Sequence, residues 1–180
     1  MSTSTARGVL PAGTWTLDPV HTHVGFAVDY MVGTFRGSFS PVEASVVVNE
    51  DGSASLTGSA AVAGVKVQDE NLGAHLQSPD FFDAERAPQI TFSSSDIVVD
   101  GDEVTVVGDL SIKGNSVPVT ATGTLSEPVD VGAGERFALT LEAQIDRTRF
   151  GLNWNNPLPS GKLALANAVT LTAELYFAKA

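Results

Sequence analysis

Histidine is the residue type in this chain that most directly suggests chemistry. His21 and His23 lie two residues apart, so on a β-strand both imidazoles would point to one face and could bind one metal ion. A tetrahedral site needs three or four converging ligands, and the chain has no cysteine to complete the set. The sequence therefore favours no metal site. We expect His21 to form a hydrogen bond with Asp18 in a turn.

The third histidine and two arginines lie in segments that interrupt the strand pattern. His75 falls on the apolar face of a short helical segment, as either a hydrogen-bonded structural residue or a contact to a ligand's polar group. Arg147 and Arg149 could contact a polar head group or form salt bridges with acids such as Asp80 and Asp83. The salt bridge is favoured for Arg149, and both alternatives stay open for Arg147.

Catalytic signatures are absent from the sequence. It contains no G-x-S-x-G, H-E-x-x-H, phosphate-binding loop or dinucleotide fingerprint. A Ser/His/Asp triad assembles in space rather than in sequence, so an enzyme is kept as an alternative. The expectation is a protein without enzyme activity and without a cofactor.

Composition narrows the remaining possibilities. A chain of 180 residues most simply forms one domain with a sizeable core. Only 17% of residues are charged and 43% are hydrophobic, so the extra apolar side chains must fill the interior or line a cavity. A net charge of -11 with no basic cluster argues against nucleic acid and against anionic membrane surfaces. No apolar run approaches the roughly 20 residues of a membrane helix, so we expect no stable membrane insertion.

The N-terminus predicts a tail rather than a targeting signal. Residues 1–12 are small and polar, which predicts a flexible tail ahead of a single domain at 13–180. They lack the apolar core of about 7–15 residues found in secretory signals, so a cytoplasmic location is expected. The absence of cysteine excludes disulfides but does not decide the compartment.

Alternation of apolar and polar residues dominates the chain and predicts β-strands. Apolar parity changes at Pro41 and again within the strand predicted at 89–99, and a bulge is expected at Pro41. Short hairpin links imply an antiparallel up-and-down sheet, and eight such strands close into a barrel that has no exposed edges. The fold class is therefore all-β. The strands are predicted at about 24–31, 34–49, 53–63, 89–99, 104–112, 117–125, 137–145 and 165–177.

One stretch departs from alternation and predicts a short helical insert at about 68–83. Its apolar residues recur at helical spacing, Asp69 can cap the helix start, and Pro79 cannot continue the helix. Ser78 can cap a second helical start, and the paired rings Phe81–Phe82 follow it. An amphipathic insert in an all-β chain needs a surface to cover, and we expect it to cover the mouth of the barrel.

Two long connections should lie at the same end of such a barrel. In an up-and-down barrel, the links that follow the first, third, fifth and seventh strands lie at one end. The segments 64–88 and 147–164 follow the third and seventh predicted strands, so both belong to that end. The segment Asp18–His21 should lie at the opposite end. Long loops in compact domains are usually functional, so two lids at one end favour a binding mouth.

Five short motifs also follow one another at specific spacings: Trp15–Thr22, His75–Asp83, Pro88–Phe92, Gly108–Gly114 and Arg147–Gly151. Their order resembles the YceI-like family of bacterial lipid-binding proteins over about 13–178. The resemblance implies a lipocalin-like barrel whose apolar pore holds a long-chain polyisoprenoid or a similar amphiphile. Family members are often dimers and many are exported, so the resemblance also implies a possible homodimer.

The expected function is binding of a long-chain isoprenoid or fatty-acid-like lipid, as a carrier or store. Each buried methylene contributes about 0.8 kcal/mol, so ten of them give roughly 8 kcal/mol before the costs of association. The alternatives are an enzyme that acts on a lipid-like substrate through His21, His75 or a nearby acid, and a structural or interaction domain. The candidate ligand-binding residues are Phe26, Val28, Phe35, Phe39, Leu72, His75, Leu76, Phe81, Phe82, Phe92, Arg147, Phe150 and Trp154.

Overall fold

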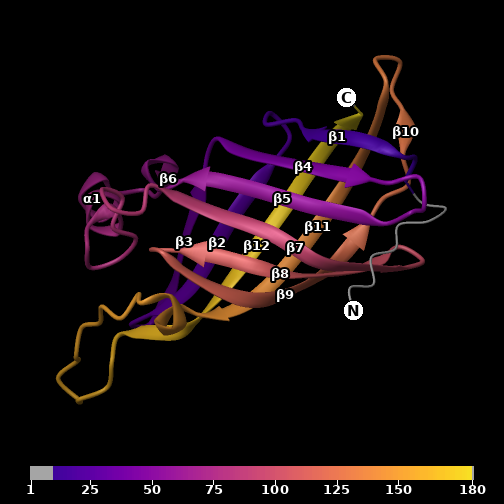
Figure 1. Cartoon of the computed structure of the whole chain (residues 1–180). Helices are drawn as coiled ribbons and strands as arrows, with labels where there is room; N and C mark the ends of the chain where they lie inside the picture. The colour runs from indigo at the N-terminus through magenta and orange to yellow at the C-terminus, as the bar shows by residue number, and fades with distance from the viewer. Residues whose placement is uncertain (1–9, 180) are drawn as a thin grey trace.

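Antiparallel pairing runs around a complete ring of strands in the computed structural model, which describes residues 10–179 (Figure 1). Pairing of the last strand with the first closes the ring, so the prediction of an all-β, eight-stranded antiparallel barrel is confirmed. In order around the barrel, the strands are β1 (Gly13–Leu17), β4 (Val42–Val48), β5 (Ala54–Ala61), β7 (Gln89–Asp100), β8 (Glu103–Ile112), β9 (Asn115–Leu125), β11 (Glu135–Asp146) and β12 (Leu165–Lys179).

The first two walls of the barrel are interrupted strands. Both β1 and β2 (His23–Tyr30) pair with β12, and residues 18–22 bulge between them. The predicted turn at Asp18–His21 therefore interrupts the first strand of the barrel. The part of that strand before the turn, β1, was not predicted as a strand. A break at Ser40–Pro41 separates β3 (Gly33–Phe39), which pairs with β2, from β4, which pairs with β1.

The predicted parity changes correspond to these irregularities. The break before β4 coincides with the parity change at Pro41. In β7 the pairing with β8 shifts between Ser94 and Asp96, which reverses the faces of the residues that follow. Short elements complete the chain: η1 (Val62–Gly64), β6 (Val65–Lys66), β10 (Val129–Asp130) and η2 (Arg147–Phe150).

The helical insert is shorter than predicted. Helix α1 spans Glu70–Gln77, and the side chain of Asp69 accepts a hydrogen bond from the Leu72 N–H at 3.1 Å, as its cap position predicts. The second helical start at Ser78 is wrong, because the Ser78 hydroxyl donates back to the His75 carbonyl and residues 79–86 form turns. Within the described range of 10–179, no helix is long and apolar enough to cross a membrane.

Both long connections meet at one end of the barrel, as topology predicts. We call 64–88 the first lid, 147–164 the second lid, and this end the lid end; Figure 1 shows α1 and the second lid on the same side. Lys113, in the β8–β9 turn, donates from Nζ to the carbonyl of Pro79 at 2.6 Å and to that of Gly151 at 3.3 Å. One turn thus connects the two lids.

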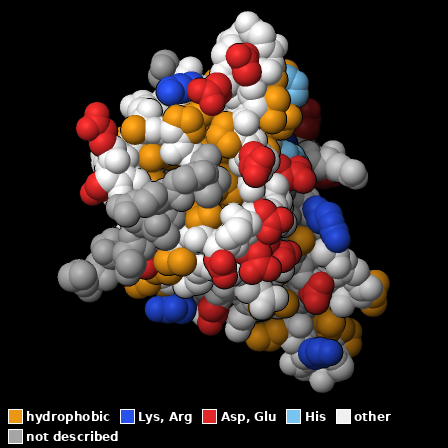
Figure 2. Space-filling model, turned by 90° about the vertical axis from the view of Figure 1, so that its right-hand side faces the viewer, with side chains coloured by type: hydrophobic (Ala, Val, Ile, Leu, Met, Phe, Trp, Pro, Cys, Tyr) orange, Lys and Arg blue, Asp and Glu red, His pale blue; other side chains and the backbone are white. Residues whose placement is uncertain are grey.

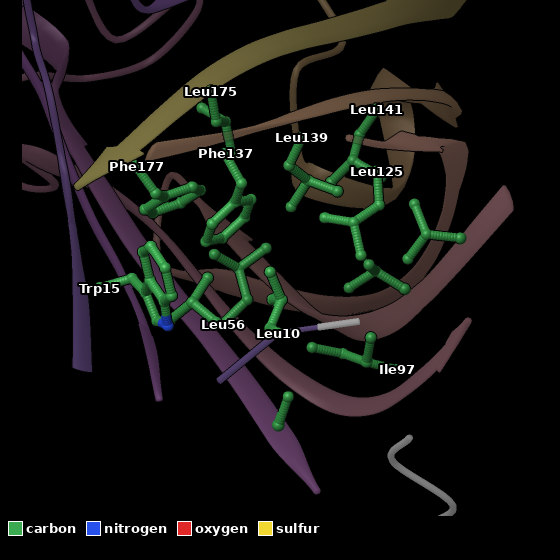
Figure 3. Packing of buried hydrophobic residues seen from close by; sticks show 14 of the residues in the cluster. Leu10, Trp15, Leu56, Ile97, Leu125, Phe137, Leu139, Leu141, Leu175 and Phe177 are labelled. Atoms are coloured by element: carbon green, nitrogen blue, oxygen red, sulfur yellow. The ribbon is translucent and has the colours of Figure 1, made fainter. Parts of the chain in front are cut away.

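Large rings fill the other end of the barrel, here called the far end (Figure 3). Trp15 packs edge-on against Phe137 at 4.9 Å between ring centroids, and Phe137 stacks on Phe177 at 5.1 Å. Leu10 is buried in this cluster, so ordered packing begins within the predicted tail; residues 1–9 lie outside the described residues. The far end is therefore a packed core.

Replacement of Gly123 by alanine should destabilise the barrel. A Cβ atom at Gly123 would lie 1.6 Å from the backbone carbonyl oxygen of Thr140, so β9 and β11 would have to separate. We expect Gly123→Ala to lower the free energy of unfolding by about 3 kcal/mol or more, measured by urea denaturation. At Gly33 a Cβ would meet nothing within 4 Å, so Gly33→Ala should change stability by less than about 0.5 kcal/mol. Equal unfolding midpoints for the two variants would contradict this packing.

Candidate functional site

A cavity of about 250 Å³ lies inside the barrel. Its volume is near the lower end of the roughly 300–1,000 Å³ typical of ligand pockets. Its walls are apolar side chains and glycine backbone, apart from Ser59, Thr91, Thr172 and Arg147. The rings of the far-end cluster do not line the cavity, whereas the first lid contributes Leu76, Phe81 and Phe82, so the cavity extends from that cluster to the lid end.

Small inward-facing residues leave this space empty. Alternation along β11 points Leu141, Ala143 and Ile145 into the barrel, and the alanine between the two larger side chains leaves a gap. Ala121 and Ala173, on β9 and β12, line the same cavity. Apolar side chains of full size at these positions would fill the barrel as the rings fill the far end.

Two glycines hold aromatic rings against the cavity wall. A Cβ at Gly37 would lie 2.5 Å from the ring of Phe26, and one at Gly108 would lie 2.6 Å from the ring of Phe92. Each ring therefore lies flat over a strand position that has no side chain. This close approach places both phenylalanines in the lining.

A series of aromatic contacts joins the barrel wall to the first lid. The ring of Phe26 packs against those of Phe35 and Phe39 at 5.9 and 5.8 Å between centroids. Phe39 in turn contacts Phe82 of the first lid at 5.7 Å. These separations suit edge-to-face packing, so the lid is held over the cavity by rings that also line it.

His75, Phe81 and Trp154 form a second aromatic cluster, between the two lids. His75 lies 5.0 Å from both rings, and Phe81 lies 5.3 Å from Trp154. The Nε2 atom of His75 is 3.0 Å from a carboxylate oxygen of Asp80. Of these rings only Phe81 lines the cavity, and His75 is a hydrogen-bonded histidine between the lids. Its contact with a ligand's polar group stays a prediction.

Arg147 is buried at the base of the second lid and anchors it. Its Nε donates to the carbonyl of Ala166 at 2.8 Å, and Nη1 donates to the carbonyls of Leu152 and Trp154. Nη2 donates to the carbonyl of Leu165 at 3.3 Å. No carboxylate of the described residues lies within salt-bridge distance, and burial lowers the pKa of Arg147. Backbone carbonyls thus replace water around this charge.

The salt bridge predicted for Arg149 is wrong. The Arg149 side chain is exposed, and the two acids expected to bind it have other partners. Asp80 pairs with His75, and Asp83 lies 4.0 Å from Arg86 of its own lid. Both pairs are formed by residues close in sequence within the first lid, so Asp80 and Asp83 bind neighbours in their own lid rather than Arg149 of the second lid.

The expected contact of His21 with Asp18 is confirmed, at 2.9 Å between Nδ1 and a carboxylate oxygen. This hydrogen bond, followed by one from the Val20 N–H, lowers the pKa of Asp18. Neither His21 nor His23 lines the cavity. Among residues 10–179, no group of three metal-ligating side chains comes together.

The candidate residues divide between the cavity wall and its surroundings. Four candidates do not line the cavity: Leu72, His75, Phe150 and Trp154. Phe150 is a fully buried residue of the second lid, and Leu72 is partly exposed on α1. The candidates that do line it are Phe26, Val28, Phe35, Phe39, Leu76, Phe81, Phe82, Phe92 and Arg147.

Sequence reasoning missed most of the aliphatic lining. Alternation along the strands already pointed these side chains inward, but it could not say which depth of the barrel is empty. The missed lining residues include Val24, Leu56, Ile90, Leu110, Ile112, Val119, Ala121, Leu141, Ala143, Ile145, Leu152, Val169, Leu171 and Leu175.

Comparison with known proteins identifies similar chains. The family model of the YceI-like domain matches residues 15–177. A UPF0312 protein of Staphylococcus aureus strain USA300 is 27% identical over 170 residues, which cover 91% of this chain and 96% of that protein.

Two solved structures share the fold at similar extent. BcnA of Burkholderia cenocepacia superimposes with a TM-score of 0.72 at 25% identity, covering 89% of this chain and 98% of that one. A polyisoprenoid binding domain from Saccharophagus degradans superimposes with a TM-score of 0.66 at 12% identity, covering 92% and 98%.

Arg147→Lys should loosen the second lid. A lysine ammonium has three donors at one point and cannot reach the carbonyls that the guanidinium binds on two sides. We expect a loss of about 3 kcal/mol in the free energy of unfolding, with faster hydrogen exchange in 152–166 than elsewhere. Arg149→Lys makes the same chemical change at an exposed position and should leave both measurements unchanged. Similar exchange rates in the two variants would show that Arg147 does not hold the lid.

Proposed function

The chain belongs to the family of YceI-like domains, and on that premise we propose that it binds a long-chain isoprenoid or similar amphiphilic lipid. The observation that carries the proposal is the apolar cavity, which ends at the ring cluster of Trp15, Phe137 and Phe177 and is covered by the lids at its other end. A cavity walled by hydrocarbon suits a hydrocarbon guest. The shared fold of the polyisoprenoid binding domain supports the same class of ligand.

The proposed guest enters tail first. The interior presents few polar groups, and most N–H donors of Arg147 are already used by backbone carbonyls. A polar group buried there without a partner would cost free energy, so the polar end of the lipid stays at the lid end. Each methylene that enters the cavity contributes about 0.8 kcal/mol.

We propose a carrier or store rather than an enzyme. The enzyme alternative named His21, His75 or a nearby acid, and each of these two imidazoles pairs with a carboxylate outside the cavity wall. A general base has to reach the proton that it abstracts, within about 3 Å of the bound substrate. Neither histidine is placed to do so for a guest in the cavity.

Mass spectrometry of the protein purified from its own cells tests this function. The native protein should carry one lipid, and organic extraction should release a species with an isoprenoid or fatty-acyl mass. A protein that is empty and that also fails to bind added prenyl lipids would refute the proposal.

Filling the cavity should weaken lipid binding without loss of stability. Ala143→Phe places a ring in the empty space and displaces part of the guest, so affinity for a fluorescent prenyl lipid should fall at least about tenfold. Stability should stay within about 1.5 kcal/mol of the wild type, because the new ring enters a void. The matched control is Gln144→Phe, which puts the same ring on the solvent side of the same strand. Equal affinities for the two variants would place the ligand elsewhere.

A further inference from the structure

Exposed apolar side chains project from the lid end beside the second lid. Met31 and Val32 form the turn between β2 and β3; Val32 is fully exposed and Met31 is 55% exposed. The Met31 N–H donates to the carbonyl of Ala164 at 2.8 Å, which places the turn against Leu163, also 55% exposed. We call Met31, Val32 and Leu163, together with Lys162, the mouth tip.

The backbone of this turn is unfavourable for its sequence. Met31 has φ of 54°, in the left-handed region where glycine or asparagine is usual. The turn between β7 and β8 places Gly101 in that region, and the turn between β8 and β9 places Lys113, also with φ of 54°, and Gly114 there. The turn at Met31 departs from the usual preference for polar residues or glycine in two-residue turns, because its two side chains are apolar and exposed to solvent. Such departures are typical of functional positions.

The second lid beside this turn forms a firm projection. Pro157 and Leu163 form a β-bridge, and the Leu158 N–H donates to the Lys162 carbonyl at 2.8 Å. Figure 1 shows the segment between β11 and β12 projecting beyond the barrel at the lower left. Its apolar and cationic side chains are thus presented to one side of the molecule.

Charge is distributed unevenly around the barrel. The second lid, 147–164, contains three cations and no acid, and Arg149 and Lys162 are exposed. Acids lie around it: Asp146 caps η2, and Asp29 lies at the base of the turn. Asp80 of the first lid binds His75, whose ring contacts Trp154 of the second lid. By contrast, the far-end turns 49–53 and 100–103 contain five acids and no cation, and Figure 2, which views that end, shows acidic side chains gathered there. The first lid contains five acids and two cations, so of the two lids the second is the one that suits an anionic partner.

We propose that the mouth tip docks on the surface of a lipid bilayer that contains anionic lipids. Its apolar side chains enter the interface, and Arg149 and Lys162 contact the anionic headgroups. The net charge of -11 opposes binding of the whole chain to an anionic surface, so docking requires that the acidic far end face away from the membrane. The tip adjoins the lid end of the cavity, so docking brings the cavity entrance to the layer in which a lipid guest resides.

A second projecting hairpin provides the internal contrast. Val129 and Val131, near β10, are 59% and 57% exposed, much like the apolar residues of the mouth tip. Val129 pairs with Arg136, and Asp130 pairs with Glu135, so this far-end hairpin combines one cation with two acids, and the acids repel an anionic surface. Exposure of valine alone therefore does not define the docking surface; the excess of cations over acids in the second lid does.

Vesicle flotation of the full chain tests the docking surface. The probes are vesicles of equal parts phosphatidylcholine and phosphatidylglycerol, and vesicles of phosphatidylcholine alone. The wild type should float with the mixed vesicles, less so at high salt, and bind phosphatidylcholine vesicles weakly. Val32→Asp combined with Lys162→Glu should reduce flotation about tenfold, whereas Val129→Asp combined with Val131→Asp should not.

Affinity for a fluorescent prenyl lipid in solution separates this proposal from the proposed function. The mouth-tip variant should keep wild-type affinity, because none of its changed residues lines the cavity. Loss of flotation with retained lipid affinity supports docking. Wild-type protein that fails to float with the mixed vesicles, or equal loss in the far-end variant, overturns docking while leaving lipid binding to be judged on its own.

Discussion

Closure of the barrel between β12 and β1 is the constraint on which the rest of the structure depends. Pairing of Trp15 with Lys179 and of Leu17 with Phe177 joins the ends of the described chain and leaves no open edge in the ring of eight strands. The same pairing brings the indole of Trp15 into the interior, against Phe137 and Phe177. Closure therefore also packs the far end, and the cavity lies between this packed cluster and the lids.

The lids are held by polar contacts that leave the cavity apolar. Arg147 and Lys113 bond to backbone carbonyls of the lids and of β12, so their charges are satisfied at the rim. The aromatic contacts of Phe82 and Trp154 add hydrophobic packing to this rim. Arg147 and Phe82 also line the cavity, so the residues that hold the lids and those that border the empty space overlap at this rim.

The low charge content of the chain has a structural explanation. A closed barrel hides one face of every strand, and the inward side chains around the cavity are apolar although they leave part of the interior empty. The acids that remain are concentrated in the first lid and the far-end turns, while the second lid has none. Composition alone averages these regions into one net charge, and this average conceals the cationic, apolar side at Lys162 and Leu163.

The sequence by itself determined the features that depend on near neighbours. Alternation predicted the strands and their inward faces, Asp69 marked the helix start, and the parity changes marked the interruptions before β4 and in β7. Only the tertiary structure decided that the ring of Phe137 is packed whereas Ala143, on the same strand, borders empty space. It also decided that Arg147 binds carbonyls and that Asp80 binds His75. The physical reason is that a period of two specifies a face, whereas filled volume and pairing partners depend on side chains from all strands and both lids at once.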